Sequence, residues 1–301
     1  MNTERLLLCR PMGGLNDMLC QIEKACRYAE RFDRTVVVDA NYYLSRYFRD
    51  DLSTYFTSRQ STLILDPAEL GERLDEMEVF PGVLTGRVSR YETRYDLDLY
   101  QYVDAESARP LSFDFERDYA EPLIVHHDDG GGEMSLGALA RLRLRPELRE
   151  ALSQRLRRIG PRYSGVHVRN TDYRVRYEGL LSAGKIDPND PIFVATDNVE
   201  VVARFRDAFG AERVHSFASL PDLAGYPLHH IRDPQEAYER NRDAILDLLM
   251  LALATSLHMF QLEPNPYDIK HSGFSLLAAN LRGAPAILAG LIEESPDPSA
   301  S

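Results

Sequence analysis

Hydrophobic and polar positions along the first half of the chain alternate between short apolar runs and stretches with helical spacing. Arg5–Cys9 predicts a strand, and apolar residues three and four apart after the loop at Arg10–Leu15 predict a helix that ends near Phe32. Further short apolar runs predict strands at Thr35–Asp39, Thr62–Asp66 and Leu123–His127. Residues 81–119 show no clear period, and we expect them to be irregular.

The second half resumes the pattern after the glycines at positions 130–132. An arginine-rich helical stretch is expected from Leu136 to Arg158, with an interruption at Pro146. The strands predicted beyond it are Tyr163–Val168, Ile192–Thr196, Arg213–Phe217, Leu257–Leu262 and Ala286–Ala289, and the helices are Val199–Phe209, Gln235–Thr255 and Ser272–Leu281. Alternating strands and helices are typical of α/β proteins. We therefore expect two Rossmann-like domains, residues 1–145 and 146–301.

The charge balance narrows the class of ligand. The 301 residues include 35 Lys or Arg and 47 Asp or Glu, which gives a formal net charge of −12. An acidic chain repels phosphate backbones at long range, which argues against a general binder of nucleic acid or of anionic membranes. A locally positive pocket for one phosphorylated small molecule remains compatible with this charge.

The three cysteines, Cys9, Cys20 and Cys26, have no metal-like spacing and are expected to be buried free thiols in a reducing compartment. The apolar run at the N-terminus is too short for a signal peptide. The longest apolar stretch, Ala244–Leu253, contains Asp247 and is too short to cross a membrane. Together these features predict a cytoplasmic protein without a transmembrane segment.

The first candidate site is the sequence Gly165–Tyr173, where an apolar strand ends in Arg169. Ligands of open α/β sheets bind at the carboxyl ends of the strands, and a guanidinium there suits a phosphate because it donates two hydrogen bonds and keeps its charge. His167 lies two residues earlier, on the same face of the strand. The competing interpretation is a core histidine followed by a surface arginine.

Two loops that open helices could present backbone N–H groups to an anion. In one, Ser272 is the expected N-cap of a helix, and it is followed by Gly273, Phe274 and Ser275. The other runs through Gly13, Gly14, Leu15, Asn16 and Asp17, and lacks the GxGxxG of dinucleotide sites. An ordinary capping serine and an ordinary glycine turn are the alternatives.

Three acidic segments leave other interpretations open. Asp197, after a predicted strand, either meets a sugar or base hydroxyl or caps the next helix. Asp96 and Asp98 match the DxD motif of metal-dependent glycosyltransferases, although acids alternating on a solvated strand give the same pattern. The residues at 126–129 (HHDD) are a weak metal site, because neighbouring strand residues point to opposite faces.

Taken in order, these motifs resemble those of the α-1,2-fucosyltransferases and of the superfamily that also contains α-1,6- and protein O-fucosyltransferases. The resemblance covers residues 5 to about 283. It rests on the Gly-Gly-Leu loop at Gly13, His-Val-Arg-x-x-Asp-Tyr from His167, Thr-Asp-Asn from Thr196, Asp-Leu-Leu-Met from Asp247 and Ser-x-Phe-Ser from Ser272.

The resemblance implies a GT-B fold, with two Rossmann-like domains facing across a cleft. The N-terminal domain would take a glycan acceptor and the C-terminal domain a nucleotide sugar. The implied reaction is inverting transfer of fucose from GDP-fucose without a metal ion or cofactor. By the same analogy Arg169 neutralises the departing diphosphate, His167 lines the nucleotide pocket, Asp247 lies near the base, and Ser272, Gly273, Phe274 and Ser275 hold phosphate oxygens.

The chain departs from the family pattern at two of these positions. Asn170 stands where the family usually has a second arginine, and Asp17 replaces an amide expected to face the donor. Asp17 and Asp172 are the candidates for a general base. Two alternatives stay open: a metal-dependent GT-A enzyme that uses Asp96 and Asp98, and a non-catalytic protein that binds nucleotides or glycans on the same fold.

Overall fold

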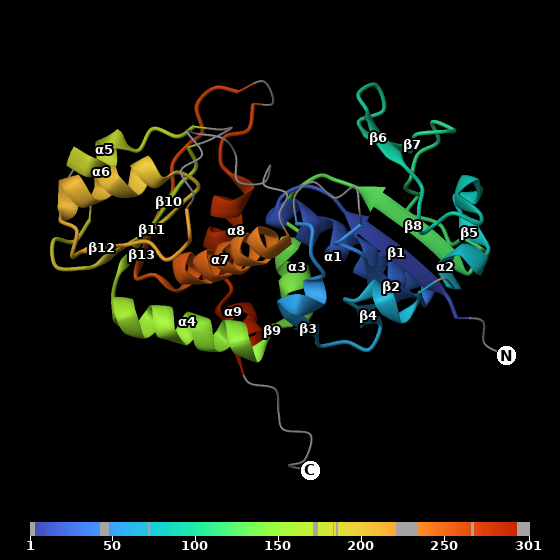
Figure 1. The fold of residues 1–301 in the computed structure, drawn as a ribbon, viewed down its shortest axis with the longest axis horizontal. Helices are drawn as coiled ribbons and strands as arrows, with labels where there is room; N and C mark the ends of the chain where they lie inside the picture. Colours follow the sequence, from blue (N-terminus) through green and yellow to red (C-terminus); the bar gives the residue numbers. More distant parts are fainter. Residues whose placement is uncertain are drawn as a thin grey trace, which may run out of the picture. The chain divides into compact units, whose positions relative to one another are not determined.

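The computed structural model describes residues 4–42, 48–71, 73–170, 174–182, 184, 186–220, 234–265 and 268–293. The chain divides into two compact units, Met1–Arg143 and Leu144–Ser301. Each unit is built on its own parallel sheet (Figure 1).

The first unit contains a five-stranded parallel sheet in the order β4-β2-β1-β8-β5. Its central strand, β1, is buried along its whole length, which explains the unbroken apolar run that predicted it. The strands are β1 (Leu6–Pro11), β2 (Thr35–Val38), β4 (Leu63–Ile64), β5 (Val79–Phe80) and β8 (Leu123–Asp128).

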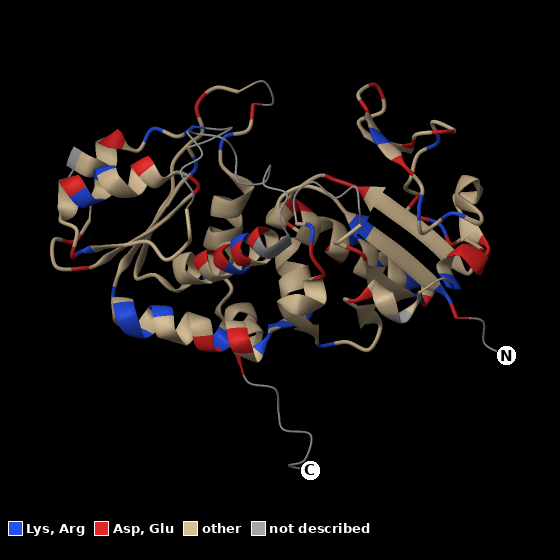
Figure 2. Ribbon diagram, viewed as in Figure 1, with Lys and Arg blue, Asp and Glu red and all other residues tan. Residues whose placement is uncertain are grey.

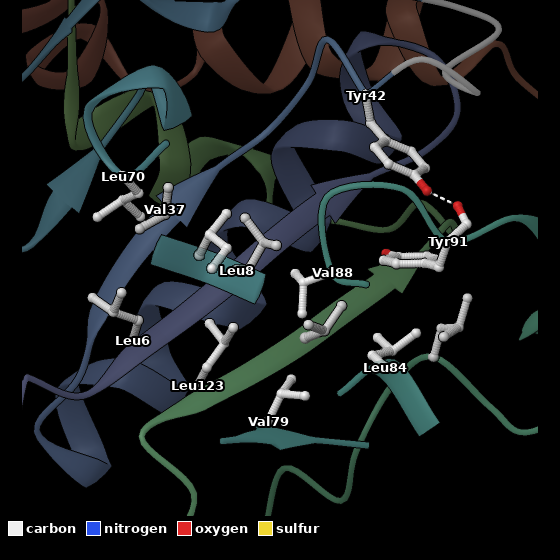
Figure 3. Close-up of a cluster of buried hydrophobic side chains, with 13 residues drawn as sticks. Leu6, Leu8, Val37, Tyr42, Leu70, Val79, Leu84, Val88, Tyr91 and Leu123 are labelled. Atoms are coloured by element: carbon white, nitrogen blue, oxygen red, sulfur yellow. Dashed lines mark hydrogen bonds between the residues drawn. The ribbon is translucent and has the colours of Figure 1, made fainter. Parts of the chain in front are cut away.

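A hydrophobic cluster covers one face of this sheet (Figure 3). Leu6 and Leu8 project from β1 and meet Leu123 of β8, and the Tyr42 hydroxyl closes the cluster by donating a hydrogen bond to the Tyr91 carbonyl. Two helices belong to the same unit and pack against each other: α1 (Leu15–Phe32) and α3 (Ser135–Ala140). The predicted strand–loop–helix start of the chain is therefore confirmed.

The stretch expected to be irregular contains an antiparallel hairpin, so that prediction was wrong in part. It is formed by β6 (Thr93–Asp96) and β7 (Gln101–Asp104), and its tip exposes Leu97 and Tyr100. Each strand of this hairpin is only four residues long, and only Val103 and Asp104 at the end of β7 are buried, which is too few positions to show a strand period in the sequence. Besides β4 and β5, the short elements between β2 and β6 are η1 (Leu52–Thr54), β3 (Phe56–Ser58), η2 (Pro67–Glu69), α2 (Arg73–Glu76) and η3 (Gly82–Leu84).

The predicted helix from 136 to 158 is two helices separated by a strand. After α3, β9 (Leu142–Leu144) pairs with β3, with its two leucines buried and Arg143 between them. Three residues give too short an alternation to stand out beside helical neighbours. Helix α4 (Pro146–Ile159) then starts with proline at its first position, where a missing N–H costs nothing.

The second unit has a four-stranded parallel sheet in the order β12-β11-β10-β13. Helices α7 and α8 pack against each other, as do α4 and α7. The strands are β10 (Ser164–Val168), β11 (Ile192–Thr196), β12 (Val214–His215) and β13 (Ser256–His258), and the helices after α4 are α5 (Glu178–Ser182), α6 (Val199–Phe209), α7 (Pro234–Leu253), α8 (Gly273–Arg282) and α9 (Pro285–Ile292).

The last predicted strand, Ala286–Ala289, lies inside helix α9, so that prediction was wrong. Pro285 opens the helix, and Leu288 and Leu291, three residues apart, are its buried leucines. A four-residue apolar run does not distinguish a strand from a buried helix. None of the described helices is by itself long and apolar enough to cross a membrane. Helices α8 and α9 reach that length and apolar composition only when taken together, and a bend of 95° separates them.

Candidate functional site

The carboxyl ends of β10 and β11 lie side by side in the second unit, with His167 opposite Ala195. Arg169 directly follows β10. The Asp197 carboxylate accepts a hydrogen bond from the backbone N–H of Asn170 at 2.8 Å and so ties the two strand ends together. The cap of helix α6 is Asn198 instead, whose side chain accepts from the Glu200 N–H, so the capping interpretation of Asp197 was wrong.

His167 connects the strand end to the start of helix α8. Its Nδ1 lies 2.6 Å from the Ser275 hydroxyl, and its ring centroid is 5.0 Å from that of Phe274. Burial, reinforced by the positive charge of Arg169, lowers the pKa of His167 to about 3. The imidazole is therefore neutral near pH 7, and of these two side chains Arg169 carries the positive charge.

Helix α8 begins at Ser272, and its first turn supplies the polar groups predicted from sequence. Ser272 is the N-cap, but its side chain makes no capping hydrogen bond. Its hydroxyl is buried and has no hydrogen-bond partner in the described part of the chain. The first N–H groups of a helix also lack partners within the helix and carry its positive dipole end. This helix start therefore has unused donors of the kind that an anion requires.

A cavity of about 300 Å³ brings these elements together within the second unit. Arg169, Asp197, Asp247, His167 and Phe274 all line it, whereas the predicted residues Ser272, Gly273 and Ser275 are not among its lining residues. The residues that complete the lining come from the end of β11, the segment after β12 and helix α7: Ala195, Thr196, Ala218, Ser219, Leu220, Glu236, Glu239, Arg240, Asp243 and Ala244.

Helix α7 gives this cavity an acidic wall that includes a buried ion-pair network. Arg155 of α4 donates to Asp247 at 2.8 Å and also to Asp243, and all three side chains are buried. Burial raises the pKa of Asp247 to about 7, with Asp243 raising it further and Arg155 opposing the rise. Figure 2 shows the basic and acidic residues that α4 and α7 carry.

Sequence reasoning missed Arg155, because a helix rich in arginine is most simply explained as an exposed face whose arginines pair with acids such as Glu147 and Glu150. Arg157 does pair with Glu150 at the surface. Arg155, however, is a buried residue of α4 together with Leu148, Leu152 and Ile159. The spacing of these four positions is the signal that the sequence offered, since a charged residue on the apolar stripe of a helix needs a buried partner.

The glycine loop predicted from the N-terminus belongs to the first unit. Gly14 is the N-cap of α1, and its N–H donates to the Asp17 carboxylate at 3.3 Å. The Asn16 side chain donates to the Gly132 carbonyl at 3.4 Å. A Cβ at Gly131 would lie 2.4 Å from Asp17 Oδ1, so glycine at that position is what allows the second loop to approach.

This arrangement places Asp17 among the backbones of two glycine loops. Gly13, whose φ is +97°, adopts a conformation that favours glycine and also lies against Asp17. Gly13, Gly14, Asn16 and Asp17 thus form one loop at the start of α1, and their contact with the donor stays a prediction. The other candidate base, Asp172, falls outside the described residues.

The DxD pair shapes the hairpin between β6 and β7. The Asp96 carboxylate accepts hydrogen bonds from the N–H groups of Asp98 and Leu99, at 3.1 and 3.2 Å, and pairs with Arg94. Its oxygens are therefore used by the turn. Among the described residues, no group of three or more His, Cys, Asp or Glu side chains is arranged to hold a metal ion.

Comparison with known proteins gives matches at the level of structure. No family model and no curated protein matches the sequence. Among solved structures, the chain is similar to the fucosyltransferase NodZ from Bradyrhizobium, with a TM-score of 0.58, 20% identity, and coverage of 92% of this chain and 93% of that one.

Two further structures are similar over nearly the whole chain. A NodZ α-1,6-fucosyltransferase soaked with GDP-fucose gives a TM-score of 0.55 at 18% identity, with 92% of each chain covered. The apo form of POFUT1 gives 0.53 at 11% identity, with 95% of this chain and 97% of that one covered.

The chain has the fold of these fucosyltransferases. The α/β class and the two Rossmann-like units of the GT-B type are therefore confirmed. A GT-A enzyme is a different architecture, so that alternative is set aside, in agreement with the use of Asp96 by its own turn.

Proposed function

We propose that this protein is an inverting glycosyltransferase that moves fucose from GDP-fucose to a glycan acceptor without a metal ion. The observation that carries the proposal is the cavity in which Arg169 and His167 meet the start of helix α8. A positive side chain beside unused helix donors matches the needs of a diphosphate. The Ser272 hydroxyl, buried at the same helix start and without a hydrogen-bond partner among the described residues, supports this assignment.

Arg169 would act on the leaving group. In the transfer, the acceptor oxygen forms a bond to C1 of the sugar while the bond from C1 to the phosphate oxygen breaks. The electron pair of that bond leaves with GDP, so negative charge develops on the diphosphate. Without a metal, a fixed guanidinium and the N–H groups of Gly273 and Phe274 are the groups that can stabilise this charge.

The acidic wall supplied by α7 supports a guanine base. Guanine presents a ring N–H and an amino group along one edge, and carboxylates accept hydrogen bonds from such donors. Asp247 is our choice for this contact, with Arg155 fixing its orientation. The similarity to a fucosyltransferase structure obtained with GDP-fucose favours the same donor here.

The acceptor hydroxyl must lose its proton as the new bond forms. Asp17 and Asp172 remain the candidates for the base. Asp17 lies at the start of α1 with its carboxylate held by the Gly14 N–H, a fixed position suited to receiving a proton. The motif resemblance favours an α-1,2 linkage, which methylation analysis of the product would distinguish from α-1,6.

GDP binding should weaken below pH 7. Because the pKa of Asp247 is about 7, this carboxyl becomes protonated as the pH falls and loses the negative charge that makes it a strong acceptor for the base. His167 stays neutral over the same range and does not compensate. We expect the Kd for GDP, measured by calorimetry, to rise by up to about tenfold per pH unit below 7. An Asp247→Asn variant whose Kd follows the same pH dependence would contradict this role.

Thermal-shift measurements with GDP, UDP, CMP and dTDP test the donor. We expect a marked rise in Tm with GDP alone, because binding to the native state stabilises it. A transfer assay with GDP-fucose and a glycan panel then tests catalysis, and the rate should be unchanged by EDTA. Binding of GDP without any product would favour the non-catalytic alternative, whereas a response to UDP alone would reject the proposed donor.

A further inference from the structure

The first unit contains a second hollow, of about 650 Å³, which none of the predicted site residues explains. It lies where β8 ends, between the segments around Pro81 and Ser112. Its volume falls in the range of roughly 300–1,000 Å³ that small-molecule sites occupy. Aromatic walls come from Phe80, Phe113, Phe115 and Tyr119, and polar groups from Lys24, Gln101, Arg109, Ser112, Asp114 and Asp128.

A buried hydrogen-bond chain fixes what Ser112 offers to this hollow. Gln21 faces the Gly130 carbonyl, which can only accept, so the amino group of the Gln21 amide must be on that side. Its Oε1 then faces His126 Nε2 at 2.8 Å, and His126 Nε2 must carry the proton. His126 is completely buried, and burial lowers its pKa to about 3, so the ring is neutral and Nδ1 is an acceptor.

The Ser112 hydroxyl must therefore donate its hydrogen to His126 Nδ1, 2.8 Å away. Only oxygen lone pairs are left for a molecule in the hollow, so Ser112 acts there purely as an acceptor. Asp128, which also lines the hollow, is an acceptor as well and is oriented by the Asp129 N–H at 3.0 Å. Lys24 and Arg109 supply donors on the same walls.

The charges that line the hollow balance. Two cationic side chains, Lys24 and Arg109, face it together with two carboxylates, Asp114 and Asp128. A strongly anionic ligand would meet the carboxylates, and a cationic one would meet Lys24 and Arg109. A neutral molecule whose hydroxyls both donate and accept can use acceptors and donors alike. The C–H faces of such a molecule would pack on Phe80 and Phe115. The Lys24 ammonium group lies 4.3 Å from the Phe115 ring centre, so this donor stands next to the aromatic surface.

We propose that this hollow is a saccharide-binding subsite, in which Ser112 and Asp128 accept hydrogen bonds from ring hydroxyls of a neutral glycan. Its use by the acceptor of the transfer reaction rests on the proposed function, whereas saccharide binding itself does not. Gln21 and His126 are positioning residues, because they act only through Ser112.

Ligand-observed NMR with lactose, cellobiose and N,N′-diacetylchitobiose at millimolar concentration tests binding. We expect saturation transfer to at least one of them. Ser112→Ala and Asp128→Asn should each weaken its Kd by about tenfold, since the first removes an acceptor and the second replaces one carboxylate oxygen with an NH2 donor. The exposed Glu92→Gln should leave the Kd unchanged. No binding of the three sugars to the wild-type protein, or wild-type affinity in both variants, would overturn the proposal.

Two measurements test separately the hydrogen-bond chain through Gln21 and His126 and the use of the hollow by the acceptor substrate. Long-range ¹H–¹⁵N spectra should show His126 as the neutral Nε2–H tautomer at pH 7; the opposite tautomer would contradict the argument for Ser112. In the transfer assay, Ser112→Ala should raise KM for the acceptor and leave the Tm response to GDP unchanged. If GDP does not raise the Tm of the wild-type protein, the proposed function is refuted but saccharide binding by this hollow is not. If Ser112→Ala leaves the KM for the acceptor unchanged, the acceptor does not use this hollow.

Discussion

Replacing Arg169 with alanine should slow sugar transfer by about 100- to 1,000-fold. That is the range seen when one preorganised donor is removed from developing negative charge. Arg169 is only partly buried at the end of β10, so the fold should persist. The measurement is kcat/KM for GDP-fucose, with far-UV circular dichroism as the check on folding.

Two further variants make this result specific. Arg169→Lys keeps the charge but loses the planar fork, so we expect intermediate activity. Arg162→Ala removes an arginine whose side chain is 68% exposed, near Asp190, and should leave the rate unchanged. An Arg169→Ala enzyme that turns over at nearly the wild-type rate would remove the central argument for a diphosphate at this strand end.

Asp39→Ala should destabilise the first unit by about 3–5 kcal/mol, the cost of leaving a buried charge without its partner. Asp39 accepts a hydrogen bond from Arg10 Nε at 2.7 Å, and the two side chains are only 10% and 4% exposed. The Arg10 guanidinium also donates to the Val88 carbonyl and lies 3.8 Å from the Tyr42 ring centre, contacts that hold it in its buried position. Because the chain lacks tryptophan, urea unfolding is best followed by circular dichroism.

A double substitution tests whether the uncompensated charge is the cause. Arg10→Met together with Asp39→Leu should recover part of the lost free energy of unfolding, because no charge is then buried. As a surface control, Glu4→Ala breaks an ion pair with Arg73 whose side chains are 48% and 60% exposed, and should cost about 1 kcal/mol or less. Equal effects of Asp39→Ala and Glu4→Ala would show that burial of the Arg10–Asp39 pair is unimportant.

The elements that carry the proposed donor site were predictable because their signals are local. An apolar run ending in Arg169 specifies a strand and the edge where the guanidinium emerges, and Ser272-Gly273 specifies a helix start. The periodicity of α1 and α6 fixed both helices closely. The hydrophobic pattern did not predict the β6–β7 hairpin, β9 or α9, because each of these elements offers only a few positions from which a period can be recognised.

The alternation of strands and helices can be read from the sequence, and with it the strand end and helix start of the proposed donor site. Which distant groups share an environment is visible only in the folded chain. Folding paired Arg155 with Asp243 and Asp247, set Asp17 against Gly131, and ordered Gln21, His126 and Ser112 into one hydrogen-bond chain. The reason is physical: secondary structure follows from interactions a few residues apart, whereas burial and hydrogen-bond partners depend on segments that meet only when the chain has folded.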